Sequence, residues 1–300
     1  MRYKPINSNL NVGIIIGVIS VSSAALFIRL ADAPPLIIAS YRMAIGASVM
    51  LGIAMGSWYR HGTNYLSRIT KRDMPIIVIS AICLSMHFWA WILSLEYTSV
   101  ASSVVLVTTS PFILSIASRG LFKEPIHRHT VIGTGIGIVG GGVIAIGDSG
   151  SGTALAGDFL AFLGALSVAG YMLAGRRLRS HVPSLTYNSL VYTGATFILF
   201  AITLIMEVSF TGYSAETYLW ILILGLVPQA IGHSLLNWSL GHVTATTVAI
   251  AVMAEPVLAT GAAAIFLSET PSLSTILGGF LILSGIYTAI KHGRTQKLGS

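Results

Sequence analysis

The fold of this chain is decided by the stretch GTGIGIVGGGVIAIGDSG, residues 133–150. Two signatures of soluble enzymes lie in it. The spacing G-x-G-x-x-G, which begins at Gly135, matches a dinucleotide-binding fingerprint, and the tetrapeptide GDSG, which begins at Gly147, matches the nucleophile segment of a chymotrypsin-like protease. Because such motifs are meaningful only in their structural context, the surrounding sequence has to decide between these activities and another class of protein.

Composition indicates a membrane protein. Of the 300 residues, 54% are apolar and 9% are charged, and the mean hydropathy is +0.82, whereas soluble domains carry about 25% charged residues. Ten long runs are almost free of charge: residues 12–28, 36–56, 74–93, 99–118, 130–147, 156–175, 185–206, 218–239, 244–267 and 273–290. Each has roughly the length that crosses a bilayer, where only a helix satisfies its own backbone groups. The sequence therefore predicts an all-α integral membrane protein with ten transmembrane helices.

In this setting the opening stretch is a spanning helix. A dinucleotide-binding fingerprint needs a preceding strand and an acidic residue about 20 positions later, on a soluble sheet. Here Gly133, Gly137 and Gly141 recur every four residues and predict a smooth face for close helix packing. The GDSG segment is interpreted as a turn that follows the fifth helix. Neither enzyme signature is retained.

The basic residues predict the orientation in the membrane. If the connections alternate between two sides, 15 of the 17 Lys and Arg residues fall on the side of the N-terminus, and only Arg29 and Arg42 do not. Short cytoplasmic loops carry the excess of positive charge. We therefore expect both termini to be cytoplasmic and the protein to lie in the cell membrane. The net charge of +7 reflects this topology, and no nucleic-acid partner is predicted because no basic stripe carries interleaved exposed aromatics.

An internal repeat divides the chain into residues 1–147 and 148–300. Pro111 and Pro256 are 145 positions apart, and the same shift relates Gly133 to Gly278. Each half holds five predicted helices, an odd number, so the second half should be inverted with respect to the first. Inverted repeats are typical of secondary transporters. The glycine faces of the two halves predict packing either within a monomer or across a homodimer.

Four segments together resemble a known family: LSLEYTSVASSVVLVTTSPFILSIASRGLFKEPI, GTGIGIVGG, GDFLAFLGALSVAGYMLAGRRL and LLNWSLGHVTATTVAIAVMAEPVLATGAAAIFLSETPSLSTILGGFLILSGI. Each half shows a run of small polar residues, a proline within a helix, a glutamate near the helix end and then a glycine-rich helix. This pattern is similar to that of the drug/metabolite transporter superfamily, specifically the ten-helix EamA-type exporters. The resemblance implies alternating access, export, and a central cavity lined by helices one, three, four, six, eight and nine.

The candidate site centres on helices four and nine. Pro111 and Pro256 should bend these helices, because each removes a backbone donor, and matched breaks in two repeats point to a transport site. Packing geometry alone is the alternative interpretation. Glu255 is the only carboxylate deep within a predicted span. A charge there is costly, so Glu255 should face a cavity or a partner, or be protonated. Glu255 is therefore a candidate substrate-binding or proton-carrying residue, and a structural carboxyl that hydrogen-bonds a neighbouring helix is the alternative.

Further polar and aromatic side chains lie within the predicted spans. The candidate substrate-binding residues are His87 and Trp91 on helix three, Ser102 and Thr109 on helix four, Tyr171 on helix six, and Gln229, His233 and Asn237 on helix eight. A buried histidine more often bonds a neighbouring helix, and Ser and Thr often bond back along their own helix. Arg42 either attracts a carboxylate or clamps a helix end. The clamp is favoured, since the resembling family places helix two at the periphery.

These features predict a transporter that exports small organic metabolites, amino acids foremost, through a midplane cavity. An efflux carrier for lipophilic cations or drugs, with Glu255 as counter-charge, is the alternative. An intramembrane enzyme ranks lower, because no nucleophile and base are in register, and a scaffold has no need of buried polar residues. The expected partners are a small-molecule substrate and the lipid bilayer. No cofactor is expected, and no metal, because no His-x-x-x-His pair occurs on one helix.

Overall fold

The predicted spans all contain helices in the computed structural model, which describes residues 8–62, 69–122, 128–147, 152–178, 181–239, 248 and 251–291. Within these residues the secondary structure is helical and no strand occurs, so the all-α prediction is confirmed. In the described part of the chain, seven helices are long and apolar enough to cross a membrane, and three shorter apolar helices accompany them. The predicted turn at 148–150 and most of residues 244–250 lie outside the described residues.

The first half begins with a span made of two helices. Its elements are α1 (Ser8–Ser22), α2 (Ala24–Leu30), α3 (Pro35–His61), α4 (Met74–Tyr97), α5 (Val100–Val107), α6 (Ser110–Phe122) and α7 (Arg128–Gly147). The local sequence explains where several of these helices begin or end. Pro35 opens α3, where a missing N–H costs nothing, and Gly62 ends it at φ 62°, a conformation that favours glycine. The Ser99 hydroxyl accepts a hydrogen bond from the Ser102 N–H and so caps α5.

The second half contains a π-helix. Its elements are α8 (Gly152–Leu178), α9 (Ser184–Ile205), α10 (Ala215–Leu224), the π-helix η2 (Gly225–His233), α11 (Ser234–Ser239), α13 (Glu255–Phe266) and α14 (Leu273–Lys291). Segment η2 holds Pro228, which lacks the N–H that an α-helix needs at that position. Such π-segments are rare and occur preferentially at functional sites. The eighth span is therefore irregular at its centre, which the hydrophobic pattern alone did not predict.

The fourth predicted span is not one continuous helix. The apolar run 99–118 was predicted to be one spanning helix. The structure instead has a turn at Thr108–Thr109, which separates α5 from α6. In the second half a turn at Met253–Ala254 directly precedes α13. The two turns are 145 positions apart, and Pro111 and Pro256 each occupy the second residue of the helix that follows. Both prolines thus mark a helix start, where proline is tolerated, and the bends lie just before them.

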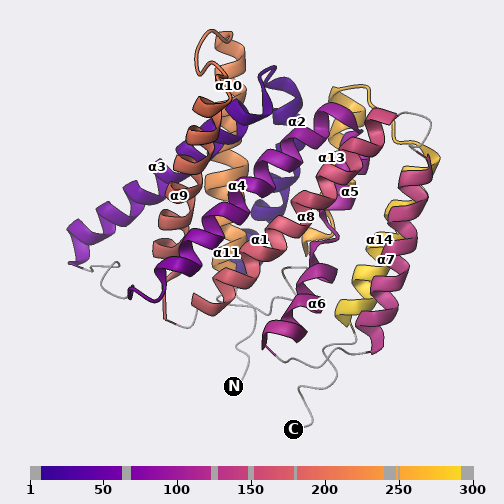
Figure 1. Cartoon of the computed structure of the whole chain (residues 1–300), viewed down its shortest axis with the longest axis horizontal. Coiled ribbons are helices and arrows are strands. Elements are labelled where there is room, and N and C mark those ends of the chain that lie inside the picture. Colours follow the sequence, from indigo (N-terminus) through magenta and orange to yellow (C-terminus); the bar gives the residue numbers. More distant parts are fainter. Residues whose placement is uncertain are drawn as a thin grey trace.

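Helices α7 and α14 pack closely along one edge of the bundle (Figure 1). A Cβ added at Gly133 would lie 2.3 Å from the Gly285 carbonyl oxygen, and one added at Gly140 would lie 2.6 Å from the Gly278 oxygen. Gly133 and Gly140 of α7 therefore pack on α14 within the chain, whereas Gly141, which the predicted face also included, lies near Leu106 of α5 instead. The contact is reciprocal, since Gly133 and Gly278 are repeat counterparts, as are Gly140 and Gly285.

We expect Gly133→Ala to destabilise the protein by about 1–3 kcal/mol, because the methyl group meets backbone that cannot move without separating α7 from α14. Gly135→Ala is the matched control on the same helix, since nothing lies within 4 Å of its added Cβ. Denaturant titration in detergent micelles measures both variants. Equal stability of the two variants would contradict the close contact.

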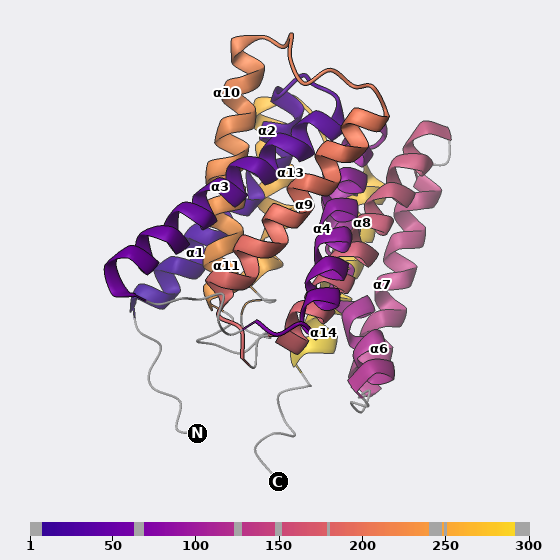
Figure 2. The same cartoon turned by 60° about the vertical axis from the view of Figure 1, so that its left-hand side comes forward.

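The connections α2–α3 and α9–α10 meet at one end of the bundle, at the top of Figures 1 and 2. Side chains on α7 and α14 that face away from the bundle are large and apolar. They include Val131, Ile132, Ile138, Val139, Leu273, Ile276, Leu277 and Phe280. Such a surface is suited to lipid.

Candidate functional site

A buried guanidinium lies where α3, α4 and η2 meet. Arg42 on α3 is 0% exposed, and its Nε donates a hydrogen bond to Gln229 Oε1 at 2.9 Å. The guanidinium carbon lies 4.1 Å from the centre of the Phe88 ring and 5.7 Å from that of Trp91. The His233 ring contacts Phe88 edge to face at 5.8 Å. We call Arg42, Phe88, Trp91, Gln229 and His233 the central cluster.

Small residues allow this close approach. A Cβ at Gly46, one turn beyond Arg42, would lie 2.6 Å from Gln229 Cγ. The missing side chain lets η2 come near enough to α3 for the glutamine to reach the arginine. A cation over an aromatic face gains about 2 kcal/mol when desolvated, so the Phe88 ring stabilises a charge that would otherwise be costly in a span.

His87 belongs to the helix contact rather than to the centre of the cluster. Its Nδ1 donates to the Gly164 carbonyl of α8 at 2.9 Å, and its ring is stacked on Trp91 with centroids 6.1 Å apart. Gly164 has little room for a side chain, since an added Cβ would lie 3.3 Å from Trp91 Cβ. His87 therefore orients the Trp91 ring that covers Arg42.

Glu255 is the first residue of α13 and follows the turn at Met253–Ala254. It interacts electrostatically with Arg42. The two residues form no salt bridge within 4.0 Å in the described chain. Opposite charges thus lie near one another without direct contact.

Tyr171 and Asn237 form a second polar group. Asn237 Nδ2 donates to the Tyr171 hydroxyl at 3.5 Å and to Asn188 Oδ1 at 3.4 Å. Tyr171 also stacks on Tyr187 with centroids 5.9 Å apart. Because Asn237 lies one turn beyond His233, this group continues the polar face of the eighth span away from η2.

The two predicted residues of the fourth span lie elsewhere. Ser102 is buried and shares a hydrogen bond of 3.1 Å with the Thr275 hydroxyl of α14. The hydroxyl of Thr109, in the turn after α5, donates to the Leu106 carbonyl of α5 at 2.7 Å. Of the nine predicted substrate-binding residues, the structure thus brings His87, Trp91, Gln229 and His233 together, with Glu255 in electrostatic range.

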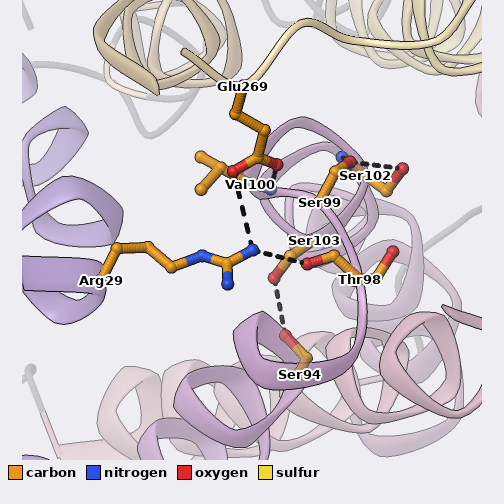
Figure 3. A network of polar contacts seen from close by, with 8 residues as sticks. All are labelled: Arg29, Ser94, Thr98, Ser99, Val100, Ser102, Ser103 and Glu269. Atoms are coloured by element: carbon orange, nitrogen blue, oxygen red, sulfur yellow. Dashed lines mark hydrogen bonds and ion pairs between the residues drawn. The ribbon is translucent and has the colours of Figure 1, made fainter. Parts of the chain in front are cut away.

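One carboxylate connects three segments at the end of the bundle that holds the α2–α3 connection (Figure 3). Glu269 Oε1 accepts from the Val100 N–H at 2.5 Å, and Oε2 lies 3.6 Å from Arg29 Nη2. The same Arg29 nitrogen donates to the Thr98 carbonyl at 3.0 Å. Below it, the hydroxyls of Ser94 and Ser103 are 2.6 Å apart. We call these contacts the Arg29–Glu269 network.

Two pockets flank this network. One has a volume of about 350 Å³ and is lined by Arg29, Glu96, Tyr97, Thr98, Ser99, Ala154, Thr270, Ser272 and Thr275. The other, of about 160 Å³, shares Arg29 and Glu96 and reaches Ile38 and Leu95. Neither pocket is lined by a residue of the central cluster, so both lie apart from Arg42.

The central cluster combines several groups that can bind a charged solute. It offers a cation, a nearby carboxylate, amide and imidazole groups, and aromatic walls. In the described part of the chain, no three His, Cys, Asp or Glu residues come together in a way that could hold a metal ion.

The sequence interpretation undervalued Arg42. It favoured a clamp on a helix end, whereas Arg42 bonds the side chain of Gln229 in the middle of η2. A lone arginine within a spanning helix is a candidate functional residue, and this signal was present in the sequence.

Known proteins resemble this chain in sequence and in fold. A sequence model of the EamA-like transporter family matches residues 10–146 and again residues 155–290. An uncharacterized transporter of Bacillus subtilis, YdfC, is 23% identical over 99% of this chain and 96% of its own length. An uncharacterized transporter of Archaeoglobus fulgidus is 23% identical over 88% and 91% of the two chains.

A solved crystal structure that is 20% identical covers 98% of this chain and 100% of its own, with a TM-score of 0.68. This likeness shows a common fold. Because the family model covers both halves of the sequence, the chain belongs to the EamA-like transporter family.

Proposed function

We propose that the protein is a secondary transporter that exports small organic metabolites, with amino acids as the first expected substrates, by alternating access. The observation that carries the proposal is the pair of helix breaks at Thr108–Thr109 and Met253–Ala254, in equivalent positions of the two halves. Broken helices at matched positions are the recurrent construction of transport sites. The second break leads directly into Glu255, which is in electrostatic range of Arg42.

We further propose that residues 1–147 and 148–300 are inverted repeats. Three observations support this: the family model matches twice, the α7–α14 glycine contacts are reciprocal, and Phe88 contacts His233, its counterpart at a shift of 145. Residues that touch their own counterparts are expected on a pseudo-two-fold axis. The central cluster would then lie on the axis about which the halves exchange roles.

We propose a location in the cell membrane with both termini in the cytoplasm, because the basic residues gather on the side of the N-terminus. The Arg29–Glu269 network would then lie at the outer end. The monomer is taken as the transporting unit, since the Gly133 and Gly140 contacts are made within one chain.

Efflux of lipophilic cations is the second candidate. Glu255 and the rings of Phe88 and Trp91 favour it, because a carboxylate and aromatic faces attract organic cations. Arg42 at the same place disfavours it, since like charges repel at short range. A zwitterion satisfies both charges, and amino acids therefore rank first. Chemical conversion of the solute is not part of the proposal.

The test is transport by the purified protein in liposomes. Labelled amino acids and tetraphenylphosphonium are offered to vesicles that hold the unlabelled compound, with and without a pH gradient. We expect saturable amino-acid exchange that is absent from protein-free vesicles. Exchange of the cation alone would overturn the amino-acid proposal in favour of the second candidate, and chromatography of the recovered solute would reveal any chemical conversion.

A further inference from the structure

Arg42 has hydrogen-bonding capacity that its surroundings do not use. Its Nε is satisfied by Gln229, but Nη1 and Nη2 are both buried and have no hydrogen-bond partner among the described residues. The indole Nε1 of Trp91 is likewise buried without a partner. A buried donor left unpaired is costly, and more so when it is charged. Such a group requires an acceptor that the described residues do not supply.

The geometry restricts where that acceptor can bind. The Phe88 ring covers one face of the guanidinium at 4.1 Å, and the Nε edge is held by Gln229. The two Nη groups therefore form the remaining edge. Two parallel N–H donors on one edge match the two oxygens of a carboxylate, the usual bidentate partner of arginine.

The charges around Arg42 define the rest of the ligand. Glu255, Tyr192, His87 and His233 all interact electrostatically with Arg42. Glu255 is the acidic group among them, and it forms no salt bridge with the arginine. A solute with a carboxylate and an ammonium group would neutralise both residues at once. Phe88 and Trp91 would then adjoin the apolar part of such a solute.

We propose that Arg42 is the carboxylate-binding residue of the transport site, with Nη1 and Nη2 holding the carboxylate of an α-amino acid whose ammonium group is directed toward Glu255. This inference rests on the proposed transport of amino acids and names the chemical group that is recognised. It assigns to α3 a direct role in substrate binding.

The test compares leucine, threonine and phenylalanine with their carboxamides, which keep the ammonium group and lack the carboxylate. We expect wild-type liposomes to exchange the amino acids at least about tenfold faster than the amides. Arg42→Gln should lower amino-acid exchange by about 10- to 100-fold, down to the rate of the amides, because a charged bidentate contact is lost. Arg42→Lys should fall between the two, since it keeps the charge without the planar fork.

Arg60→Gln is the matched control, because Arg60 is an exposed arginine on the same helix; it should leave the acid-to-amide ratio unchanged. If Arg42→Gln lowers exchange of acid and amide alike while eluting as a single peak in detergent, Arg42 is structural and the inference is overturned. The inference is equally overturned if the acid-to-amide ratio of Arg42→Gln equals that of the wild-type protein.

Failure of the proposed function has a different signature. If the wild-type protein exchanges none of the amino acids, labelled succinate is offered to the same vesicles. Succinate exchange that Arg42→Gln abolishes supports the role of Arg42 while refuting amino-acid export. Succinate exchange that the variant leaves intact, or no succinate exchange, refutes both.

Discussion

Replacing Glu255 by glutamine is expected to reduce amino-acid exchange by at least about tenfold. Glutamine has nearly the same shape, so the start of α13 and the position of Pro256 should persist. What disappears is the negative charge in electrostatic range of Arg42. Removing one member of a buried charge pair costs about 3–5 kcal/mol when the two are in contact; the cost is smaller here, because these two are not in direct contact.

Two consequences for transport follow from that loss. The ammonium group of the solute loses its partner, which weakens binding. Arg42, now uncompensated, should also hold anions more firmly, and firm binding slows release. The first effect slows loading of the solute and the second slows its release, and neither involves a coupled proton, so the reduction should appear with and without an imposed pH gradient.

The measurement is counterflow in liposomes with matched amounts of each protein. Glu207→Gln serves as the control, because Glu207 is an exposed glutamate beyond the end of α9, and it should exchange at the wild-type rate. Exchange by Glu255→Gln within twofold of wild type would mean that this carboxyl is only structural. Loss of gradient-driven transport alone, with exchange intact, would instead make Glu255 the group that carries a coupled proton.

Removing the Glu269 side chain is expected to open the Arg29 end of the bundle. Glu269 accepts from the Val100 N–H and lies 3.6 Å from Arg29, so it connects α5 and α2 to the segment that follows α13. The ion pair contributes about 0–1 kcal/mol, since its two side chains are 32% and 24% exposed. The hydrogen bond from Val100 contributes more, about 1.5–3 kcal/mol, because its acceptor is charged.

Loss of that stabilisation should shift the equilibrium toward the open state by about 10- to 100-fold, as 1.4 kcal/mol corresponds to a factor of ten. Leu95 reports the change, because it is 1% exposed and lines the smaller pocket. With Cys83→Ala removing the single native cysteine, Leu95→Cys is labelled by a membrane-impermeant thiol reagent. Glu269→Ala should raise the labelling rate at least about tenfold.

Asp32→Ala is the matched control for this experiment. Asp32 is exposed and lines the same pocket, so its removal changes the local charge without touching the network. It should leave the labelling rate of Leu95→Cys near that of the parent. Equal rates in the Glu269→Ala and Asp32→Ala backgrounds would show that the Arg29–Glu269 network does not hold this end closed.

Much of the fold was accessible from the sequence because its causes are local. A run of apolar residues predicts a spanning helix without knowledge of its neighbours. Each of the ten predicted runs contains helix where the structure describes it, although the fourth is broken at Thr108–Thr109. The spacing of Gly133, Gly137 and Gly141 predicted a packing face on this helix, and the 145-residue shift paired Gly133 with Gly278 and Gly140 with Gly285. Glycine and proline positions carry this information because their effects act on the backbone itself.

The site was accessible only in part. His87, Trp91, Gln229 and His233 were identified because polar groups in a bilayer are costly and therefore conspicuous in the sequence. Ser102 is likewise a polar residue within an apolar run, yet it contacts Thr275 near the end of the bundle. A hydroxyl can bond its own helix, another helix or a solute, and hydropathy does not distinguish these partners.

The sequence by itself determined a membrane-embedded helical chain with two related halves. The length of an apolar run and the register of a repeat can both be read from the order of the residues alone. Only the tertiary structure decided that Arg42 lies at the centre, over Phe88 and beside Gln229. That placement depends on three helices far apart in sequence meeting at one point. It also depends on the missing side chain of Gly46, which lets them approach. Partners of this kind follow from packing in three dimensions, because no local pattern specifies which face of a helix meets which neighbour.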